Sequence, residues 1–146
     1  MVTVFTPVFN RRKMMGRLYG SLLAQTNKNF EWIIVDDGST DDLHDDVIGW
    51  NQNNNGFPIT YLYKQNGGKH RALNLGIKIA NYEAFFVIDS DDYISSDGID
   101  FIEQEFLKIK DDNGIAGMLS LRKSYEDGRI IGGGTFVQYL CRYNSI

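Results

Sequence analysis

The stretch FFVIDSDDYI, residues 85–94, places four apolar residues directly before a cluster of three aspartates. A continuous apolar run such as Phe85–Ile88 is typical of a strand that is buried on both faces. Asp89, Asp91 and Asp92 repel one another, so they favour water or a bound cation. We therefore expect a core strand whose end carries an acidic turn at the surface.

The rest of the chain alternates between strand-like runs and segments of helical spacing. The expected strands are 2–6, which Pro7 and Asn10 end, 30–35, 58–63, 85–88 and 114–123, with strand or loop at 128–139. The expected helices are 11–25, 41–50, 69–80 and 99–110, with Asn10 and Thr40 as candidate N-caps of the first two. This alternation predicts an α/β fold with a mainly parallel sheet.

Size and composition suit one compact domain, with 146 residues of which 42% are hydrophobic and 13% aromatic. Fifteen basic residues against nineteen acidic ones leave a net charge of −4, which argues against a nucleic-acid partner. The single cysteine, Cys141, excludes an internal disulfide framework and a cysteine-based zinc site. No apolar run approaches the roughly 18 residues of a membrane span. We expect a cytoplasmic location, or one at the inner face of the membrane through regions outside this chain.

Polar turns follow three of the expected strands. These turns are TPVFN at 6–10, DDGS at 36–39 and DSDD at 89–92. In an open parallel sheet, ligands bind just beyond the carboxyl ends of the strands, where the connections part. We therefore expect the three turns to share one ligand site.

A fourth segment, NGGKHRALNLG at 66–76, begins an expected helix. Its glycines allow a ligand to approach the backbone, and a helix N-terminus with Lys69, His70 and Arg71 favours phosphate. A divalent cation would bridge such a phosphate to the aspartates, because Mg²⁺ and Mn²⁺ take carboxylate and phosphate oxygens as ligands. The implied ligand is a nucleoside diphosphate that carries a transferable group.

Each motif taken alone has a simpler explanation. DDGSTDD at 36–42 is compatible with a solvated turn and a helix cap, NGG with an ordinary turn, and His44 and His70 with the surface. The DSDD cluster is harder to explain in this way, because its mutual repulsion costs stability. An EF-hand loop is excluded because Tyr93 occupies its fifth position, and neither a Walker loop nor a G-x-G-x-x-G fingerprint is present.

Four segments taken together resemble a known family. They are VTVFTPVFN (2–10), SLLAQTNKNFEWIIVDDGSTDD (21–42), NGGKHRALNLGIKIA (66–80) and FFVIDSDDYI (85–94). In this order they closely resemble the nucleotide-sugar-binding half of the family 2 glycosyltransferases. The resemblance implies the GT-A fold, a Rossmann-like three-layer α/β/α arrangement around a mainly parallel sheet. It also implies inverting transfer of a sugar from a nucleotide diphosphate, commonly UDP, to the hydroxyl of a saccharide or lipid-linked acceptor.

The resemblance assigns the nucleotide side of the site to the first two turns. Pro7, Phe9 and Asn10 match the edge of the family's nucleotide pocket. Asp37, with Asp36 beside it, matches the carboxylate that reads the base, commonly uracil.

The diphosphate side of the site is implied in the same way. Lys69 lies where the family's pyrophosphate loop runs, and DSDD matches the D-x-D motif. In that motif Asp89 faces the ribose and Asp91 faces the metal, Mg²⁺ or Mn²⁺. Asp92 shares or takes over the metal role, because the frame of the doubled motif is ambiguous.

The family's general base is an acid well downstream of this motif, and its acceptor-binding half lies there too. The acids after Asp92 lack the family's signature, and none is assigned as the base: Asp97, Asp100, Glu103, Glu105, Asp111, Asp112, Glu126 and Asp127. We expect the base beyond Ile146, in a longer protein of which residues 1–146 form a single donor-binding domain.

Two other functions remain open at this stage. A metal-dependent nucleotidyltransferase usually has a glycine-rich, arginine-containing loop after its first strand, where this chain has TPVFN. A non-catalytic sugar-nucleotide-binding module is compatible with the short length. A receiver-type phosphoacceptor domain is disfavoured, because it pairs its aspartates after the first strand.

Overall fold

The computed structural model describes residues 1–112, 115–117, 122–123, 130–131 and 141–142. The chain falls into two compact units, Met1–Gln104 and Glu105–Ile146. The first unit contains the expected alternation of strands and helices. That residues 1–146 act as one domain stays a prediction.

The first unit is built on a parallel sheet. Its strands are β1 (Val2–Val8), β2 (Phe30–Asp36), β3 (Ile59–Tyr63) and β4 (Ala84–Val87). Their order is β3-β2-β1-β4, and each neighbouring pair is parallel. The chain therefore moves outward from β1 to β3 and then crosses to the other side of β1. This reversal creates a switch point between β1 and β4, the place where open α/β sheets bind ligands.

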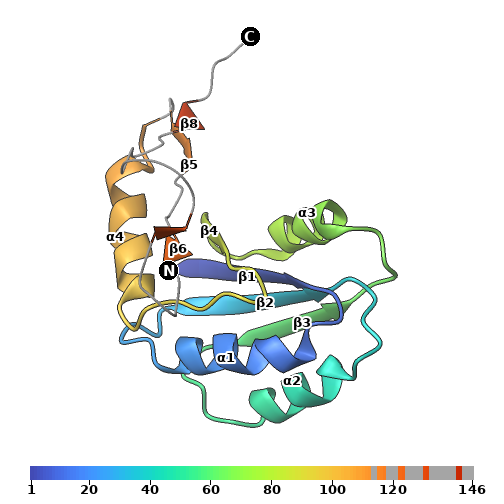
Figure 1. Cartoon of the computed structure of the whole chain (residues 1–146). Helices are drawn as coiled ribbons and strands as arrows, with labels where there is room; N and C mark the ends of the chain where they lie inside the picture. Colours follow the sequence, from blue (N-terminus) through green and yellow to red (C-terminus); the bar gives the residue numbers. More distant parts are fainter. Residues whose placement is uncertain (113–114, 118–121, 124–129, 132–140, 143–146) are drawn as a thin grey trace. The chain divides into compact units, whose positions relative to one another are not determined.

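Helices cover both faces of the sheet. Figure 1 shows α1 (Arg12–Leu23) and α2 (Leu43–Asn51) on one face and α3 (Lys69–Ile79) on the other. This arrangement confirms the predicted three-layer α/β/α fold. Because both faces of β1 and β2 are covered, every residue of these two strands is buried.

Each face of the sheet has its own apolar packing. On the α3 side, Phe5, Ile33, Val35 and Ala72 form a buried cluster. Helix α3 lies close to the sheet there, since a Cβ added at Gly76 would be 2.3 Å from the ring of Phe5. Glycine at this position permits the short distance between helix and strand.

The second face carries an aromatic stack. Tyr19 of α1, Trp32 of β2 and Trp50 of α2 contact one another, with ring centroids 6.3 Å apart for Tyr19 and Trp32, 4.5 Å for Tyr19 and Trp50 and 5.7 Å for the two tryptophans. The Tyr19 hydroxyl donates a hydrogen bond of 2.7 Å to Asn55 Oδ1. This stack attaches both helices to the same strand.

The prediction that residues 85–88 form a core strand is wrong in part. Ala84 and Ile88 are buried, but Phe85 and Phe86 are half-buried and Val87 is 39% exposed. Among the described residues β4 pairs only with β1, so it forms an edge of the sheet. An apolar run identifies a strand but does not give the strand's place in the sheet.

The prediction that Pro7 ends the first strand is also wrong, because β1 continues to Val8. Phe5 O faces β4, where it accepts a 2.9 Å bond from Ile88 N, and Val8 O faces β2, where it accepts from Asp37 N. Polar groups alternate along a strand, so the nitrogen of Pro7 faces the β4 side. Proline has no N–H to continue the ladder with β4, which ends at Phe5 and Val87, whereas pairing with β2 on the other side continues to Val8.

Both predicted helix caps are incorrect. The N-cap positions of α1 and α2 are Arg11 and Asp42, and neither side chain makes a capping hydrogen bond. Asn10 instead has a left-handed backbone with φ of 52°, a conformation that asparagine tolerates. Its side chain and that of Thr40 bond to each other's turn, as described below.

The remaining described elements are one helix and several strands of two or three residues. Helix α4 (Gly98–Ile109) matches the predicted helix 99–110. Strand β5 (Ile115–Gly117) pairs antiparallel with β8 (Cys141–Arg142), and β6 (Arg122–Lys123) pairs with β7 (Ile130–Ile131). The rest of the predicted segments 114–123 and 128–139 lies outside the described residues. No helix in the described part of the chain is long and apolar enough to cross a membrane.

Candidate functional site

The turn after β1 contacts the turn after β2. Pro7 is buried at the end of β1, whereas Phe9 is 48% exposed and Asn10 is exposed. Asn10 N donates a 2.9 Å hydrogen bond to Ser39 Oγ, and Asn10 Oδ1 accepts one of 2.8 Å from Thr40 N. The left-handed backbone of Asn10 thus lies against DDGST, with the Phe9 ring beside it at the surface.

Asp36 holds the shape of the second turn. It is only 1% exposed, and both of its carboxylate oxygens have protein partners. Oδ1 accepts from Ser39 N at 2.7 Å, and Oδ2 accepts from the Tyr61 hydroxyl at 2.6 Å. Burial and this carboxylate raise the pKa of Tyr61 above its ordinary value. Asp36 is therefore positioned to support the turn, and its predicted contact with the nucleotide stays a prediction.

Asp37 connects the second turn to the glycine loop before α3. Its Oδ1 accepts from Gly67 N at 2.9 Å and from Lys64 Nζ, and its Oδ2 accepts from Gly68 N at 2.7 Å. Burial raises the pKa of Asp37, but Lys64 and the two backbone N–H groups outweigh it and hold this pKa below its ordinary value. Asp37 is therefore ionised at neutral pH.

These contacts leave limited room for a base at Asp37. A carboxylate offers about four acceptor positions, and Lys64, Gly67 and Gly68 use three of them. The oxygen with a single partner, Oδ2, is the one that could still accept a bond from a ligand. The sequence analysis did not predict a role for Lys64. Its position between a strand and a pair of glycines could have indicated one.

The first residue of α3 connects the glycine loop to the acidic turn. Lys69 Nζ lies 2.5 Å from Asp89 Oδ1, and these side chains are 61% and 32% exposed. Gly68 precedes Lys69 with φ of 93°, a backbone conformation that favours glycine. Contacts therefore run without interruption from Asp37 through Gly68 and Lys69 to Asp89. His70, as predicted, is exposed, and so is His44.

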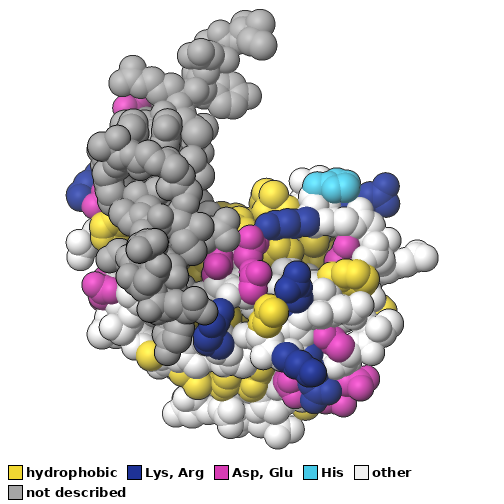
Figure 2. All heavy atoms as spheres, viewed as in Figure 1, with side chains coloured by type: hydrophobic (Ala, Val, Ile, Leu, Met, Phe, Trp, Pro, Cys, Tyr) yellow, Lys and Arg dark blue, Asp and Glu magenta, His cyan; other side chains and the backbone are white. Residues whose placement is uncertain are grey.

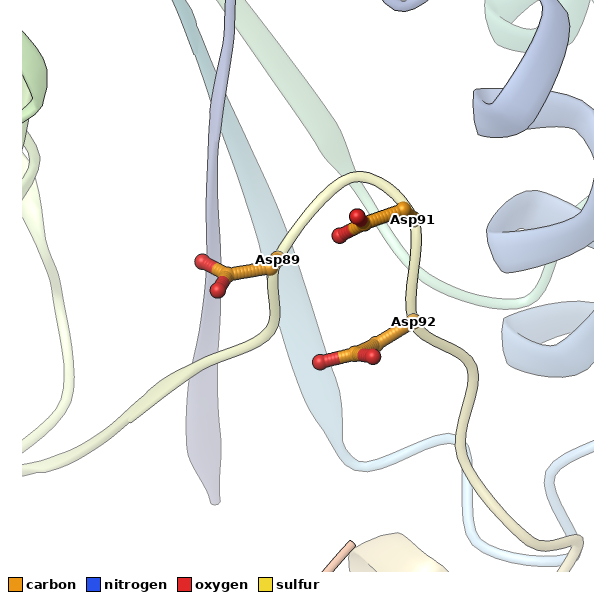
Figure 3. A group of neighbouring side chains, drawn as sticks. All are labelled: Asp89, Asp91 and Asp92. Carbon is orange, nitrogen blue, oxygen red and sulfur yellow. The ribbon is translucent and has the colours of Figure 1, made fainter. Parts of the chain in front are cut away.

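The acidic turn follows β4, as predicted. Asp89, Asp91 and Asp92 each offer a carboxylate oxygen within 4.8 Å of the others. Figure 3 shows the three on one turn, with the side chains of Asp91 and Asp92 directed toward its inner side. Asp91 is exposed and the other two are half-buried. Figure 2 shows acidic side chains gathered on the viewed face, with lysine or arginine side chains beside them.

This donor set fits a hard divalent cation. Mg²⁺ and Mn²⁺ take oxygen ligands, and Mg²⁺ in phosphate sites is usually held by one or two carboxylates together with substrate phosphates. Three carboxylate oxygens this close together repel one another, and Lys69 pairs with one of the three aspartates, Asp89. The turn therefore offers both the ligands and the electrostatic preference for a cation.

The described acids downstream of the turn have other partners. Asp100 Oδ1 and Glu103 Oε2 accept hydrogen bonds of 2.8 and 2.9 Å from Asn27 Nδ2. The Ser95 hydroxyl holds the pKa of Asp97 below its ordinary value. The two bonds from Asn27 attach α4 to the segment after α1, and these contacts indicate a structural role for the three acids. Glu126 and Asp127 lie outside the described residues.

A cavity of about 330 Å³ lies at the other end of β4, away from the turns. It is lined by Ile77, Ala80, Asn81, Tyr82, Glu83 and Phe85. These residues end α3 and begin β4, so this cavity is not part of the candidate site.

Comparison with known proteins finds a family model and relatives that match this chain. The model of the family described as Glycosyl transferase family 2 matches residues 3–132. An uncharacterized glycosyltransferase of Rickettsia felis (strain ATCC VR-1525 / URRWXCal2) is 39% identical over 132 residues, 89% of this chain. Those residues are 21% of that protein, so the chain spans about a fifth of its relative's length.

Solved structures share the fold. S. aureus TarS 1–349 matches with a TM-score of 0.73 and 24% identity in its complex with UDP, and with 0.66 and 27% in its complex with UDP-GlcNAc. Both matches cover 91% of this chain, and 38% and 37% of the respective TarS chains.

A second neighbour is a metal complex. The mannosyltransferase PcManGT from Pyrobaculum calidifontis, in complex with GDP-Man and Mn²⁺, matches with a TM-score of 0.70 and 23% identity over 86% of this chain and 36% of PcManGT. These matches confirm the predicted GT-A type of α/β fold. With its strand-end turns in contact and most of its length matched by the family model, the chain belongs to glycosyl transferase family 2.

Proposed function

We propose that this chain binds a nucleotide diphosphate sugar, a UDP-sugar in the first instance, as the donor of an inverting, metal-assisted glycosyl transfer. The observation that carries the proposal is a continuous series of contacts. Asn10 bonds to Ser39 and Ser39 to Asp36, and the adjacent Asp37 bonds to Gly68. Lys69, which follows Gly68, pairs with Asp89. These contacts join the four turns at the carboxyl edge of the sheet. The TarS complexes with UDP and UDP-GlcNAc support the choice of donor.

The nucleoside would lie over the turns after β1 and β2. Phe9 exposes a ring beside Asn10, and aromatic faces bind planar bases by stacking. Pro7 supports this edge from within β1. Asp37 would accept a base N–H at Oδ2, while Asp36 keeps the turn in place.

The diphosphate would lie between the start of α3 and the acidic turn. Lys69 and the N–H groups at this helix start favour anionic oxygens. Asp91 and Asp92 would hold Mg²⁺ or Mn²⁺, with Asp89 toward the ribose. When bound, such a cation stabilises negative charge on the leaving diphosphate. The Mn²⁺ complex of PcManGT supports this assignment.

Inverting transfer requires the acceptor hydroxyl to reach the anomeric carbon from the face opposite the diphosphate. A general base that removes the hydroxyl proton typically contributes about 10²–10⁴-fold in rate. No described acid is assigned to this role. The chain alone is therefore proposed to bind donor but to transfer sugar to a saccharide or lipid-linked acceptor slowly or not at all.

The family assignment favours this function over the nucleotidyltransferase alternative. A non-catalytic sugar-nucleotide-binding module would have the same donor site, so acceptor transfer by a longer form of the protein separates the two.

Isothermal titration of the 146-residue chain with UDP, with and without Mn²⁺, tests donor binding. The proposal predicts saturable binding that Mn²⁺ strengthens. The proposal is contradicted if UDP does not bind, or if its affinity is the same with and without Mn²⁺. The same titration with GDP tests whether uracil is preferred.

A further inference from the structure

Helix α1 contacts the acidic turn from the side, through residues spaced four apart. Arg17, Ser21 and Gln25 follow one another at this spacing, which places them along one side of α1 and its C-terminal extension. Each bonds to a backbone group of the segment 91–95. Because they bind backbone, these contacts fix the path of that segment irrespective of its side chains.

Arg17 makes the contact nearest to the proposed metal ligands. Its Nη2 donates a 2.5 Å hydrogen bond to the backbone oxygen of Asp91. Its guanidinium carbon lies 5.2 Å from the centroid of the Tyr93 ring, within the range of a cation–π contact. Arg17 therefore contacts the chain at two points, Asp91 and Tyr93, on either side of Asp92.

Ser21 and Gln25 fix the chain just beyond these points. Ser21 Oγ accepts a 3.3 Å bond from Ile94 N, and Gln25 Nε2 donates one of 2.6 Å to Ser95 O. Gln25 is only 3% exposed, and its Oε1 accepts a further bond from Ile99 N at 3.0 Å. The buried amide of Gln25 thus anchors the end of the turn, whereas Arg17 reaches it from the surface.

We propose that Arg17 is a positioning residue that holds the acidic turn in the arrangement required for cation binding. This inference rests on the metal-assisted donor binding proposed above. A cation binds a turn more tightly when its ligands are already in place, because the bound state then costs less ordering entropy. Ser21 and Gln25 fix the far end of the same segment, and Arg17 fixes the end that carries Asp91 and Asp92.

The sign of the effect distinguishes this role from plain electrostatics. Arg17 carries a positive charge beside a cation site, so through its charge alone it disfavours the cation. Removing Arg17 would then tighten cation binding. If Arg17 acts through the position of Asp91 and Asp92, its removal weakens cation binding instead.

The test is calorimetric titration of Mn²⁺ into the UDP-saturated 146-residue chain, as wild type, Arg17→Ala, Arg17→Lys and Lys13→Ala. We expect Arg17→Ala to lower the affinity for Mn²⁺ about tenfold. This is the lower end of the loss seen when a group that orients metal ligands is removed. Arg17→Lys keeps one donor and the charge, so it should lie between Arg17→Ala and wild type. Lys13 lies one turn earlier on the helix and is exposed, so Lys13→Ala is the matched loss of charge and should not weaken Mn²⁺.

A second measurement needs no metal. Hydrogen exchange of the metal-free chain, followed by mass spectrometry, should show faster exchange in peptides covering 89–95 for Arg17→Ala than for Lys13→Ala. Melting temperatures of the two variants should be similar, because both side chains are exposed.

The outcomes separate the two proposals. Wild type that binds Mn²⁺ while Arg17→Ala binds it equally or more tightly overturns the positioning role and leaves the proposed function standing. Wild type that binds UDP but no Mn²⁺ overturns the metal site and the positioning role together. Weaker binding by Arg17→Ala, with partial recovery in Arg17→Lys, supports both.

Discussion

Lys69 Nζ lies 2.5 Å from Asp89 Oδ1, so the first residue of α3 forms an ion pair with the first aspartate after β4. These residues are twenty positions apart in the sequence and begin two different parts of the proposed site. Their contact places a cationic group between a helix N-terminus that favours phosphate and a turn that favours a metal ion. Removing the positive charge of Lys69 should therefore have opposite effects on the affinities for the two ligands.

Replacing Lys69 by alanine should weaken the binding of UDP. It should strengthen the binding of Mn²⁺ measured in the absence of nucleotide. UDP loses a positive charge near its diphosphate, while Asp89 is freed from a competing cation. Because Lys69 is 61% exposed, solvent screens the charge, and changes of about three- to tenfold are expected. Calorimetric titration of each ligand measures both effects.

Lys78→Ala is the matched control, since Lys78 lies in the last turn of the same helix. It should leave both affinities unchanged. Equal losses of UDP binding in the two variants would mean that only the overall charge of α3 matters, and Lys69 would have no specific role.

Asp91→Asn should abolish the Mn²⁺ dependence of UDP binding and leave the free energy of unfolding within about 0.5 kcal/mol of wild type. Asp91 is exposed in the turn that follows β4, so its carboxylate can be changed without disturbing the core. Titration and urea denaturation give the two values. Asp45→Asn on α2, whose side chain is 75% exposed, is the control for loss of a carboxylate. If Asp91→Asn unfolds the chain, the aspartate is structural and the metal assignment fails.

The stability of the fold should fall in acid partly through Asp37. Its pKa is lower in the folded chain than in the unfolded chain, so its contribution to stability is complete well above the unfolded pKa. The contribution is lost as pH falls below about 4, through the lower folded pKa. Urea denaturation of wild type and Asp37→Asn between pH 7 and pH 3 should show a smaller acid-dependent loss in the variant. Parallel curves would contradict this.

Gly76→Ala should lower the free energy of unfolding by about 1–3 kcal/mol, a typical cost of overpacking a core. The added Cβ would be 2.3 Å from the Phe5 ring, which is fully buried and cannot move aside freely. The control is Gly20→Ala in α1, where a Cβ meets nothing within 4 Å. Gly20→Ala should stabilise by about 0.5–1 kcal/mol through helix propensity. Urea denaturation that gives both variants the same sign would show that α3 does not pack tightly on β1.

Local patterns in the sequence predict most of the first unit. The alternation of strands and helices, the buried β2 and the acidic turn all follow from residue periodicity and from the chemistry of adjacent residues. What could not be predicted depends on which elements become neighbours. Residues 85–88 have the composition of a core strand, but β4 lies at an edge of the described sheet, and Val87 is exposed as a result.

The continuation of β1 through Pro7 has a similar cause. Proline is tolerated there because its nitrogen faces β4, while the pairing with β2 on the opposite side continues to Val8, and this depends on which strands become neighbours. The predicted helix caps were also wrong, because they were chosen from residue type alone. The polar groups of Asn10 and Thr40 bond across two turns that are 30 residues apart, and this long-range contact competes with capping.

The residue types of the candidate site could be predicted from the sequence. The residues that hold its turns in place could not. Aspartates and glycines at strand ends are visible in the sequence. The contact of Arg17 with Asp91 spans 74 residues, and no local signal marks it. Lys64 precedes the glycine loop and could have been considered, but only the fold shows that it bonds to Asp37.

If the four turns form one donor site, a single ligand should perturb all of them. NMR titration of the ¹⁵N-labelled 146-residue chain with UDP and Mg²⁺ measures this. The amides of Phe9, Asp37, Gly68 and Asp91 should shift together and give a single dissociation constant. Shifts confined to one turn, or shifts at different turns with different dissociation constants, would contradict a shared site.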